Sequence, residues 1–451
     1  MHVLPQLEEL EMRFPESLVV IGVHSPKFYA EQEFQNVRQA VLRYDIRHPV
    51  VSDPDHIVWD SYAVSAWPTA VIIDPEGRVV GQHSGEFVSE DYVPVISGLE
   101  EEFDRQGKLN RAPVSLSLER DKEPARPLNF PGKILADVPA GRIFIADTGH
   151  NRILKTDLNG HVQAVVGSGE PGIADGDFAN ATFRFPYGMA VDGLSRAQPR
   201  GEILYVADTW NHSIRRVDFE SRRVDRIAGT GEQAILHRRG GPALSTALSS
   251  PWDLALCDNM LYIAMAGTHQ IWALDIPGRE VRVFAGTGRE ALADGSLQRS
   301  ALAQPSGLAL SNGRLYFADS ESSAVRVADT TAYRVETIIG EGLFEFGDRD
   351  GRGSEARLQH CLGVAYHDGF VYVADTYNNK VKLVDPADRS SRTFLGTGEA
   401  GLKDGSGVEA MLWEPGGLSI SDNQLYIADT NNHAIRIADL TTREVRTLEI
   451  G

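Results

Sequence analysis

The residues that could do chemistry recur along this sequence at regular intervals. An aspartate ends an apolar run in five copies of one phrase, and a histidine occupies a fixed place in three copies. Carboxylates and imidazoles at fixed spacing are ligands that zinc uses in proteins. The aspartates are Asp147, Asp208, Asp319, Asp375 and Asp429, and the histidines are His212, His269 and His433.

Recurrence once per repeat favours a structural role for both sets. An aspartate at a strand end can accept hydrogen bonds from backbone N–H groups of the following turn. The histidines share their repeat position with Asn151 and Asn379. Neighbouring sheets pack about 10 Å apart, whereas zinc–nitrogen bonds are about 2.0–2.1 Å. Equivalent histidines therefore cannot share one ion, and we predict neither a metal nor another cofactor.

The repeated phrase predicts the fold of the larger part of the chain. Its six copies are 54 to 61 residues apart, and Met265 replaces the aspartate in the third. Each unit contains four short apolar or alternating runs separated by turn residues, which is typical of a four-stranded sheet. Such sheets bury their faces when arranged radially, so residues 127–451 are predicted to form an all-β, six-bladed propeller.

One position of the predicted inner strands breaks the repeat. Glycine occupies it in four copies, but Lys133 and Asp253 occupy it in the other two, and Trp252 lies beside Asp253. Only inner strands reach the central channel of a propeller, so this lysine and aspartate could form a structural ion pair there or bind a ligand. The sequence leaves both alternatives open.

The turns between second and third strands should lie on one face with the long connections between blades. Long loops on a rigid scaffold are where binding usually occurs. We therefore predict binding candidates on this face and at the channel mouth. They are Lys133, His150, Asn211, Trp252, Asp253, His269, Asn378 and Asn432.

Residues 1–105 show a different pattern and predict an α/β domain. Apolar residues at helical spacing mark helices at the start and end, and residues 18–23 form a continuous apolar run typical of a buried parallel strand. Residues 69–74 and 78–83 flank a Pro-Glu-Gly turn and predict a hairpin. Residues 106–126 are polar and contain prolines, which is typical of a linker.

Composition limits the classes of function. The net charge of −19 argues against a nucleic-acid partner, which needs a basic surface. No apolar run approaches the ~18 residues that span a bilayer, and no signal peptide is evident, so we expect a cytoplasmic protein without a membrane partner. The two cysteines, Cys257 and Cys361, are expected to be buried reduced thiols.

The order of elements in the first domain resembles the thioredoxin fold. Trp67, Pro68 and Thr69 precede an apolar strand, as in the cis-proline loop of that fold, although an ordinary trans turn is the alternative. The resemblance implies a Cys-x-x-Cys motif at the start of the first helix. Pro5 matches the proline that commonly follows this motif by five residues, which places the motif just before Met1. Either the domain has lost this motif and a central strand, or Met1 is an internal methionine of a longer reading frame, which we favour.

The whole chain resembles the family of NHL repeat-containing protein 2. The resemblance rests on the segments 20–25, 65–69 and 130–133, and on repeat segments 263–272, 318–323 and 428–433. It implies a thioredoxin-like domain, here N-terminally truncated, followed by an NHL-repeat propeller. We expect a thiol–disulfide redox-family protein whose propeller binds a protein or ligand, with no catalytic residue in the chain as written. The alternatives are a non-catalytic scaffold and, less favoured, a metal-dependent propeller lyase or lactonase.

Overall fold

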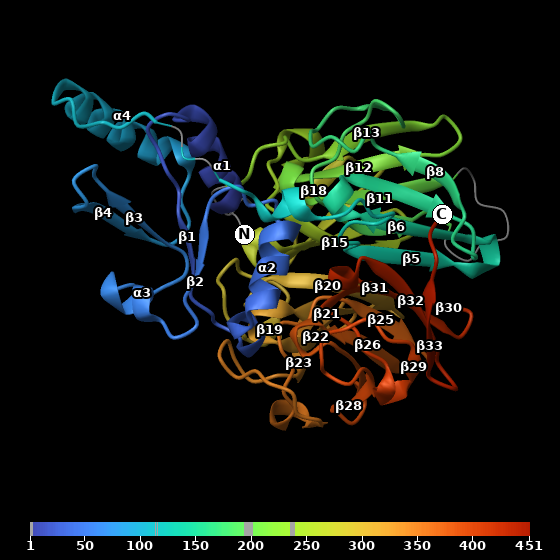
Figure 1. The fold of residues 1–451 in the computed structure, drawn as a ribbon. Helices are drawn as coiled ribbons and strands as arrows, with labels where there is room; N and C mark the ends of the chain where they lie inside the picture. The colour runs from blue at the N-terminus through green and yellow to red at the C-terminus, as the bar shows by residue number, and fades with distance from the viewer. Residues whose placement is uncertain (1–2, 113, 115, 194–201, 235–239) are drawn as a thin grey trace. The chain divides into compact units, whose positions relative to one another are not determined.

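The computed structural model describes residues 3–112, 114, 116–193, 202–234 and 240–451. The chain divides into two compact units, Met1–Ala125 and Arg126–Gly451 (Figure 1). Residues 113 and 115 of the predicted linker lie outside the described part, and the linker through Ala125 groups with the first unit. Among the described residues, no helix is both long enough and apolar enough to cross a membrane.

The first unit alternates helices with short strands, as the sequence predicts. β1 pairs in parallel with β2, and β3 and β4 form the predicted antiparallel hairpin. Leu10 of α1, Phe14 just after it and Tyr92 of α4 pack over β3. The elements are α1 (Val3–Arg13), β1 (Gly22–His24), α2 (Phe34–Arg43), β2 (Val50–Ser52), α3 (Ile57–Ser61), β3 (Thr69–Ile73), β4 (Val79–Ser84) and α4 (Ser89–Arg105), with 3-10 helices at Tyr29–Gln32 and Glu119–Lys122.

The apolar run at residues 18–23 is not the buried strand that the sequence predicts. Only its end belongs to β1, which within the described residues pairs with β2 alone. Val19, Ile21 and Val23 are 54%, 59% and 44% exposed. The prediction of burial is wrong because, in the part of the chain that the structure describes, this strand has a neighbour on one edge only and its alternate side chains are exposed.

The second unit is the predicted six-bladed propeller, and each blade contains four antiparallel strands in chain order. Blades one to three consist of β5 (Lys133–Asp137), β6 (Arg142–Asp147), β7 (Arg152–Thr156) and β8 (Val162–Val166); β10 (Pro186–Val191), β11 (Ile203–Asp208), β12 (Ser213–Asp218) and β13 (Arg223–Ala228); β15 (Pro251–Cys257), β16 (Met260–Met265), β17 (Gln270–Asp275) and β18 (Glu280–Ala285). Blades four to six consist of β20 (Pro305–Ser311), β21 (Arg314–Asp319), β22 (Ala324–Asp329) and β23 (Arg334–Ile339); β25 (Val364–His367), β26 (Phe370–Asp375), β27 (Lys380–Asp385) and β28 (Ser390–Leu395); β30 (Pro415–Ser421), β31 (Gln424–Asp429), β32 (Ala434–Asp439) and β33 (Glu444–Leu448).

A short fifth strand, which the sequence did not predict, covers the outermost strand of blades two to six. It comes from the connection that precedes the blade. These strands are β9 (Gly176–Asp177), β14 (Gly240–Pro242), β19 (Gly295–Ser296), β24 (Gly351–Arg352) and β29 (Gly405–Ser406).

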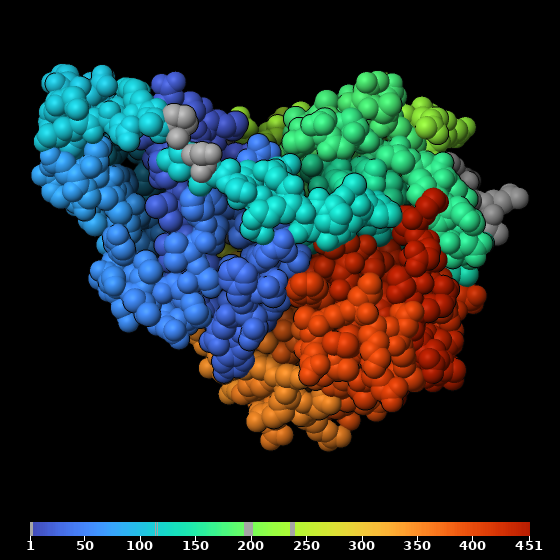
Figure 2. Space-filling model, in the orientation of Figure 1, coloured from blue at the N-terminus to red at the C-terminus, as the bar shows by residue number. Residues whose placement is uncertain are grey.

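Blade six meets blade one at the end of the chain. Gly451 donates its N–H to the Gly160 carbonyl at 3.2 Å and accepts the Val162 N–H at 3.0 Å. Figure 2 shows this C-terminal end, in red, against the blue-green surface of blade one.

The recurring aspartates at the ends of the second strands are fully buried and hold the connection that precedes the blade. The sequence predicted bonds to N–H groups of the following turn, but the backbone donor lies two residues before the inner-strand proline or Cys361 instead. The donors and acceptors are Asn129 to Asp147 (2.7 Å), Arg184 to Asp208 (2.8 Å), Ala303 to Asp319 (2.7 Å), Gln359 to Asp375 (2.7 Å) and Trp413 to Asp429 (2.8 Å).

In three blades a fully buried arginine of the third strand joins this aspartate to a second carboxylate. Arg436 donates to Asp429 at 2.9 Å and to Asp404 of the preceding connection at 2.7 Å. Arg215 and Arg326 repeat the arrangement, and Lys382 replaces the arginine in blade five. Burial raises the pKa of Asp429 to about 6, although the neighbouring arginine opposes the shift.

Blade three fills the same space without charge. Met265 replaces the aspartate and Trp272 replaces the arginine, and their exposed fractions are 0% and 2%. The Met265 sulfur accepts the N–H of Ser249 at 3.3 Å, which is the donor equivalent to Trp413 in blade six. The Trp272 indole donates to Gln270 at 3.0 Å. A well-packed apolar pair can thus replace the buried ion pair.

The replacement of the buried ion pair by Met265 and Trp272 in blade three predicts how variants of blade six change in stability. Arg436→Ala leaves the Asp429 carboxylate buried without its cation and should lower the free energy of unfolding by about 3–5 kcal/mol. The triple variant Asp429→Met, Ala434→Gln, Arg436→Trp copies blade three and should lose under about 2 kcal/mol. Urea unfolding measures both, with Arg446→Ala as a control at an exposed arginine. If the triple variant is as unstable as Arg436→Ala, the blades are not interchangeable.

Candidate functional site

The predicted cis-proline loop of the first unit is present. The Trp67–Pro68 peptide bond is cis, and Thr69 begins β3. The Trp67 indole donates its N–H to the Ser25 carbonyl at 2.9 Å, and the Thr69 hydroxyl donates to the Ala66 carbonyl at 2.7 Å. These bonds fix the loop while 47% of Trp67 stays exposed.

A second tryptophan, which sequence reasoning missed, extends this exposed surface. The Trp59 ring packs on Trp67 with centroids 4.6 Å apart. Asp53 holds the start of α3, because its carboxylate accepts the N–H groups of Val58 and Trp59 at 3.0 Å each and the Ser25 hydroxyl at 2.9 Å. Burial opposes these bonds, but together they lower the pKa of Asp53. An aspartate directly after an apolar strand was the signal in the sequence.

The two cysteines lie in the propeller, and the prediction that both are buried is wrong for one. Cys361 is 0% exposed, its thiol donates to the Ala324 carbonyl at 3.4 Å, and burial raises its pKa. Cys257 is exposed. It is the last residue of β15 and faces Met260 across a hairpin turn.

The asparagine candidates on the loop face are engaged inside the propeller. Each side-chain amide donates to the aspartate of its own blade at 2.8 Å and to a carbonyl of the preceding connection. The carbonyls belong to Gly172 for Asn211 (2.6 Å), Gly347 for Asn378 (2.7 Å) and Gly401 for Asn432 (2.7 Å). His150 contacts Asp147 at 2.9 Å. The binding role of these four residues stays a prediction.

The recurring histidines join each blade to the next. His269 Nδ1 accepts the Gln304 N–H of blade four at 3.2 Å, so this nitrogen carries no proton. The same bond recurs around the ring, from Phe185 to Asn151 (2.9 Å), Ser250 to His212 (3.0 Å), His360 to Ser323 (3.0 Å), Glu414 to Asn379 (2.8 Å) and Phe130 to His433 (3.1 Å). Within the described residues, no three His, Cys, Asp or Glu side chains are arranged to hold a metal ion.

Lys133 and Asp253 form an ion pair between the inner strands of blades one and three. Lys133 Nζ lies 2.9 Å from Asp253 Oδ2, and their exposed fractions are 5% and 7%. Asp253 also accepts the N–H groups of Leu254 and Leu308 at 2.9 Å each. A Cβ at Gly188 would lie 2.3 Å from the Asp253 Cα, so only glycine fits beside the pair. Trp252 is 5% exposed and meets the Tyr187 ring with centroids 5.5 Å apart.

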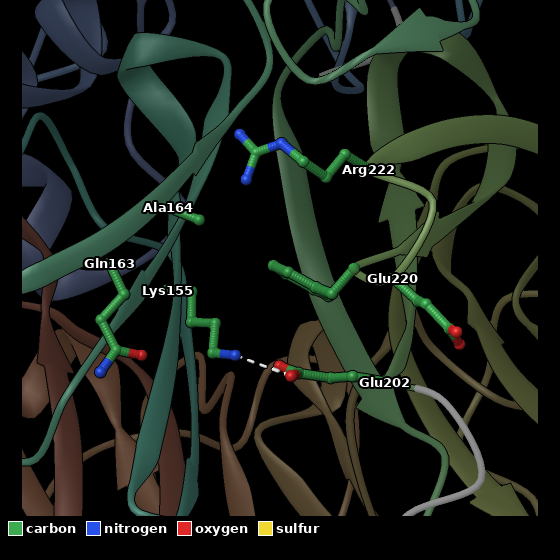
Figure 3. Close-up of a pocket in the computed structure, with 7 residues that line it drawn as sticks. Lys155, Gln163, Ala164, Glu202, Glu220 and Arg222 are labelled. Atoms are coloured by element: carbon green, nitrogen blue, oxygen red, sulfur yellow. Dashed lines mark hydrogen bonds and ion pairs between the residues drawn. The ribbon is translucent and has the colours of Figure 1, made fainter.

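A hollow of ≈ 320 Å³, which sequence reasoning also missed, lies between blades one and two (Figure 3). Lys155 donates to Glu202 at 2.7 Å and lies over the Phe219 ring at 5.1 Å. Arg222 extends toward Ala164 on its far side. The lining residues come from separate strands and turns, and they share no sequence spacing that could have predicted the hollow.

The ion pair at the axis predicts a loss of stability when one partner is removed. Lys133→Met leaves Asp253 buried without a cation and should lower the free energy of unfolding by about 3–5 kcal/mol. Adding Asp253→Asn should restore part of the loss, because the amide oxygen can still accept an N–H. Urea unfolding compares these variants with Lys403→Met at an exposed lysine. An unchanged midpoint for Lys133→Met would contradict the structural role and favour a ligand site.

Comparisons with known proteins agree with this architecture. A family model described as thioredoxin-like matches residues 1–79, and one described as NHL repeat matches residues 412–438. The chain is 24% identical over 76 residues to "Thiol-disulfide oxidoreductase YkuV" of Bacillus subtilis (strain 168), which covers 17% of the chain and 51% of that protein.

Two longer proteins match over the whole chain. "Protein SUPPRESSOR OF QUENCHING 1, chloroplastic" of Arabidopsis thaliana is 41% identical over 471 residues, covering 100% of the chain and 44% of that protein. "NHL repeat-containing protein 2" of Homo sapiens is 39% identical over 485 residues, covering 100% of the chain and 66% of that protein. The chain therefore belongs to the family of NHL repeat-containing protein 2, in which a thioredoxin-like domain precedes an NHL-repeat propeller.

Proposed function

We propose that this chain is a protein of the thiol–disulfide redox class that binds polypeptides, and that its propeller is the platform for a protein partner. The observation that carries the proposal is the loop at Trp67 and Pro68. Two tryptophans whose rings pack at a tilt, one of them half exposed, lie on a buried hydrogen-bonded base formed by Ser25 and Asp53. Rigid exposed aromatic side chains are typical anchors for a polypeptide.

The platform role is supported by how firmly the loop face is held. The connections between blades are bound by buried arginines and by Asn211, Asn378 and Asn432. A connection held in one conformation loses little entropy when a partner binds it. The net charge of −19 favours a protein partner over a nucleic acid. An exposed free thiol at Cys257 favours a reducing compartment, and we infer the cytoplasm.

Redox catalysis within residues 3–451 is not part of the proposal. Cys361 is buried with a raised pKa, and Cys257 lies on a hairpin rather than at a helix start, where the helix dipole favours a thiolate. A metal-dependent lyase or lactonase would need ligands that converge at the propeller axis. Lys133, Asp253 and glycines occupy that position instead. A scaffold without chemistry is the second candidate, which the firmly held loop face favours.

The exclusion of redox catalysis from the proposal predicts a negative result for this chain. It should not accelerate the reduction of insulin by dithiothreitol above the rate without protein, because it lacks two neighbouring reactive thiols. Turbidity of the released insulin B chain measures the rate. Clear acceleration that disappears in Cys257→Ser but persists in Cys361→Ser would place a redox site on the propeller.

The polypeptide-binding part predicts an affinity that depends on Trp67. A fluorescein-labelled, carboxymethylated insulin B chain, which is extended and thiol-free, should bind the full chain, and Trp67→Ala should weaken binding about tenfold or more. Fluorescence anisotropy measures the affinity. Tyr333→Ala removes an aromatic side chain that is 69% exposed on the propeller and serves as the matched control. Equal affinities for the two variants would remove the loop from the site.

A further inference from the structure

The outer edge of blade one differs from the outer edges of the other five blades. In blades two to six the outermost strand pairs with a short strand from the preceding connection. β8 of blade one has no such strand among the described residues. Apart from its pairing with β7, its only backbone bond there is the one from Val162 to Gly451.

Because no short strand of the described residues pairs with the outer edge of β8, the side chain of Val162 is exposed. In four blades a valine near the start of the outermost strand is almost inaccessible, with 0% of Val224, 1% of Val281, 0% of Val335 and 4% of Val445 exposed. Val162 is the counterpart, because it pairs with Thr156 at the register where Val335 pairs with Ala328. It is 38% exposed.

Val165, a second residue of β8, also differs from its counterparts in other blades. In blades four to six a threonine donates its backbone N–H outward to the aspartate of the preceding connection. The pairs are Thr337 with Asp294 (3.0 Å), Thr393 with Asp350 (3.0 Å) and Thr447 with Asp404 (3.3 Å). Their counterpart is Val165, which pairs with Leu154 as Thr337 pairs with Arg326. Val165 is 41% exposed, and no carboxylate of the described residues caps its N–H.

The two exposed valines lie on one face of β8. Their partners Thr156 and Leu154 are two residues apart on β7, and residues two apart on a strand share a face. The shift of register between Lys155 and Thr156 adds the extra residue that brings Val162 and Val165 together. The opposite face carries Gln163 and Ala164, which line the hollow of Figure 3 with Arg222.

We propose that the outer edge of β8 is a docking site for an extended segment of a partner protein, which pairs with β8 as an added strand. Open strand edges bind such segments through backbone hydrogen bonds, and side-chain pockets select the sequence. The segment places apolar side chains on Val162 and Val165. Its alternate side chains face Arg222, which favours acidic residues.

The neighbouring blades and the chain end support an extended occupant. In blades two to six, the short strand that pairs with the outermost strand always begins with glycine. Gly451 already bonds to residues on both sides of His161, which is the pattern of a parallel ladder. The proposal rests on the platform role proposed above but concerns a different surface from the Trp67 loop, so the test of this edge and the Trp67→Ala test can fail independently.

A short peptide tests the edge directly. The probe is a fluorescein-labelled heptapeptide of sequence Ser-Val-Glu-Val-Glu-Val-Ser, and the full chain should bind it with a Kd of about 10 µM to 1 mM by fluorescence anisotropy. Hydrogen exchange should slow at residues 162–166 when the peptide binds. The same peptide with methylated amide nitrogens should not bind, because it cannot donate to the edge.

Protein variants locate the site. Val165→Pro removes the N–H that points away from β7 and should weaken binding about tenfold or more. The protein should still fold, because an edge strand tolerates proline where its N–H faces solvent. The double variant Val162→Lys, Val165→Lys should do the same by charge and lost apolar contact. Val408→Lys changes a valine that is 56% exposed elsewhere and should leave the affinity unchanged.

Four results would overturn the proposal. They are no binding at about 1 mM peptide, equal binding of the methylated peptide, protection of amides elsewhere, and unchanged affinity in both edge variants. Sedimentation of the chain alone adds a fifth: self-association that Val165→Pro abolishes would assign the edge to a second copy of this chain instead of a partner.

Discussion

The propeller depends on a carboxylate that is fully buried at the end of each second strand in five blades. At this position the carboxylate accepts a backbone N–H from a residue shortly before the inner strand. In three blades it also binds an arginine, which in turn binds a second carboxylate in the preceding connection. The inner strand, the third strand and the connection are thereby joined at one point. Blade three reaches the same geometry with Met265 and Trp272. The requirement is therefore a filled space with a satisfied N–H, and charge is one way to meet it.

The repeat made the propeller predictable, because each blade carries its own strands and turns in a local stretch of sequence. The contacts between blades were harder to predict from the sequence. His212 and Thr209 bond to the next blade, at Ser250 and Pro251, about forty residues on. The recurrence of His212 once per repeat favoured a structural role, but the sequence did not show that its partner lies in the next blade. Several residues predicted as binding candidates for their place on a loop face also hold the propeller together through hydrogen bonds. The covering strands are only two or three residues long, and the glycine that begins each of them was not recognised as the start of a strand.

The first unit was predictable in its order of elements and in its proline loop, since Trp67, Pro68 and Thr69 form a local motif. The buried base beneath the loop was missed, because Ser25 and Asp53 lie 28 residues apart and only Asp53, which directly follows an apolar strand, carried a signal. The exposed position of Cys257 was missed for a related reason. Cysteine is usually buried, but its burial depends on what lies over a hairpin end, and the sequence does not specify this.

The junction between blades six and one carries the same bond as every other junction, but it joins residues much farther apart. The bond from Phe130 to His433 spans 303 residues, whereas the equivalent bonds elsewhere span 34 to 38. Closing the longer loop in an unfolded chain costs about 2 kcal/mol more, since each doubling of length adds about 0.6 kcal/mol. The ring is therefore expected to open first at this junction, and a molecule that bridges blades six and one would hold the whole propeller closed.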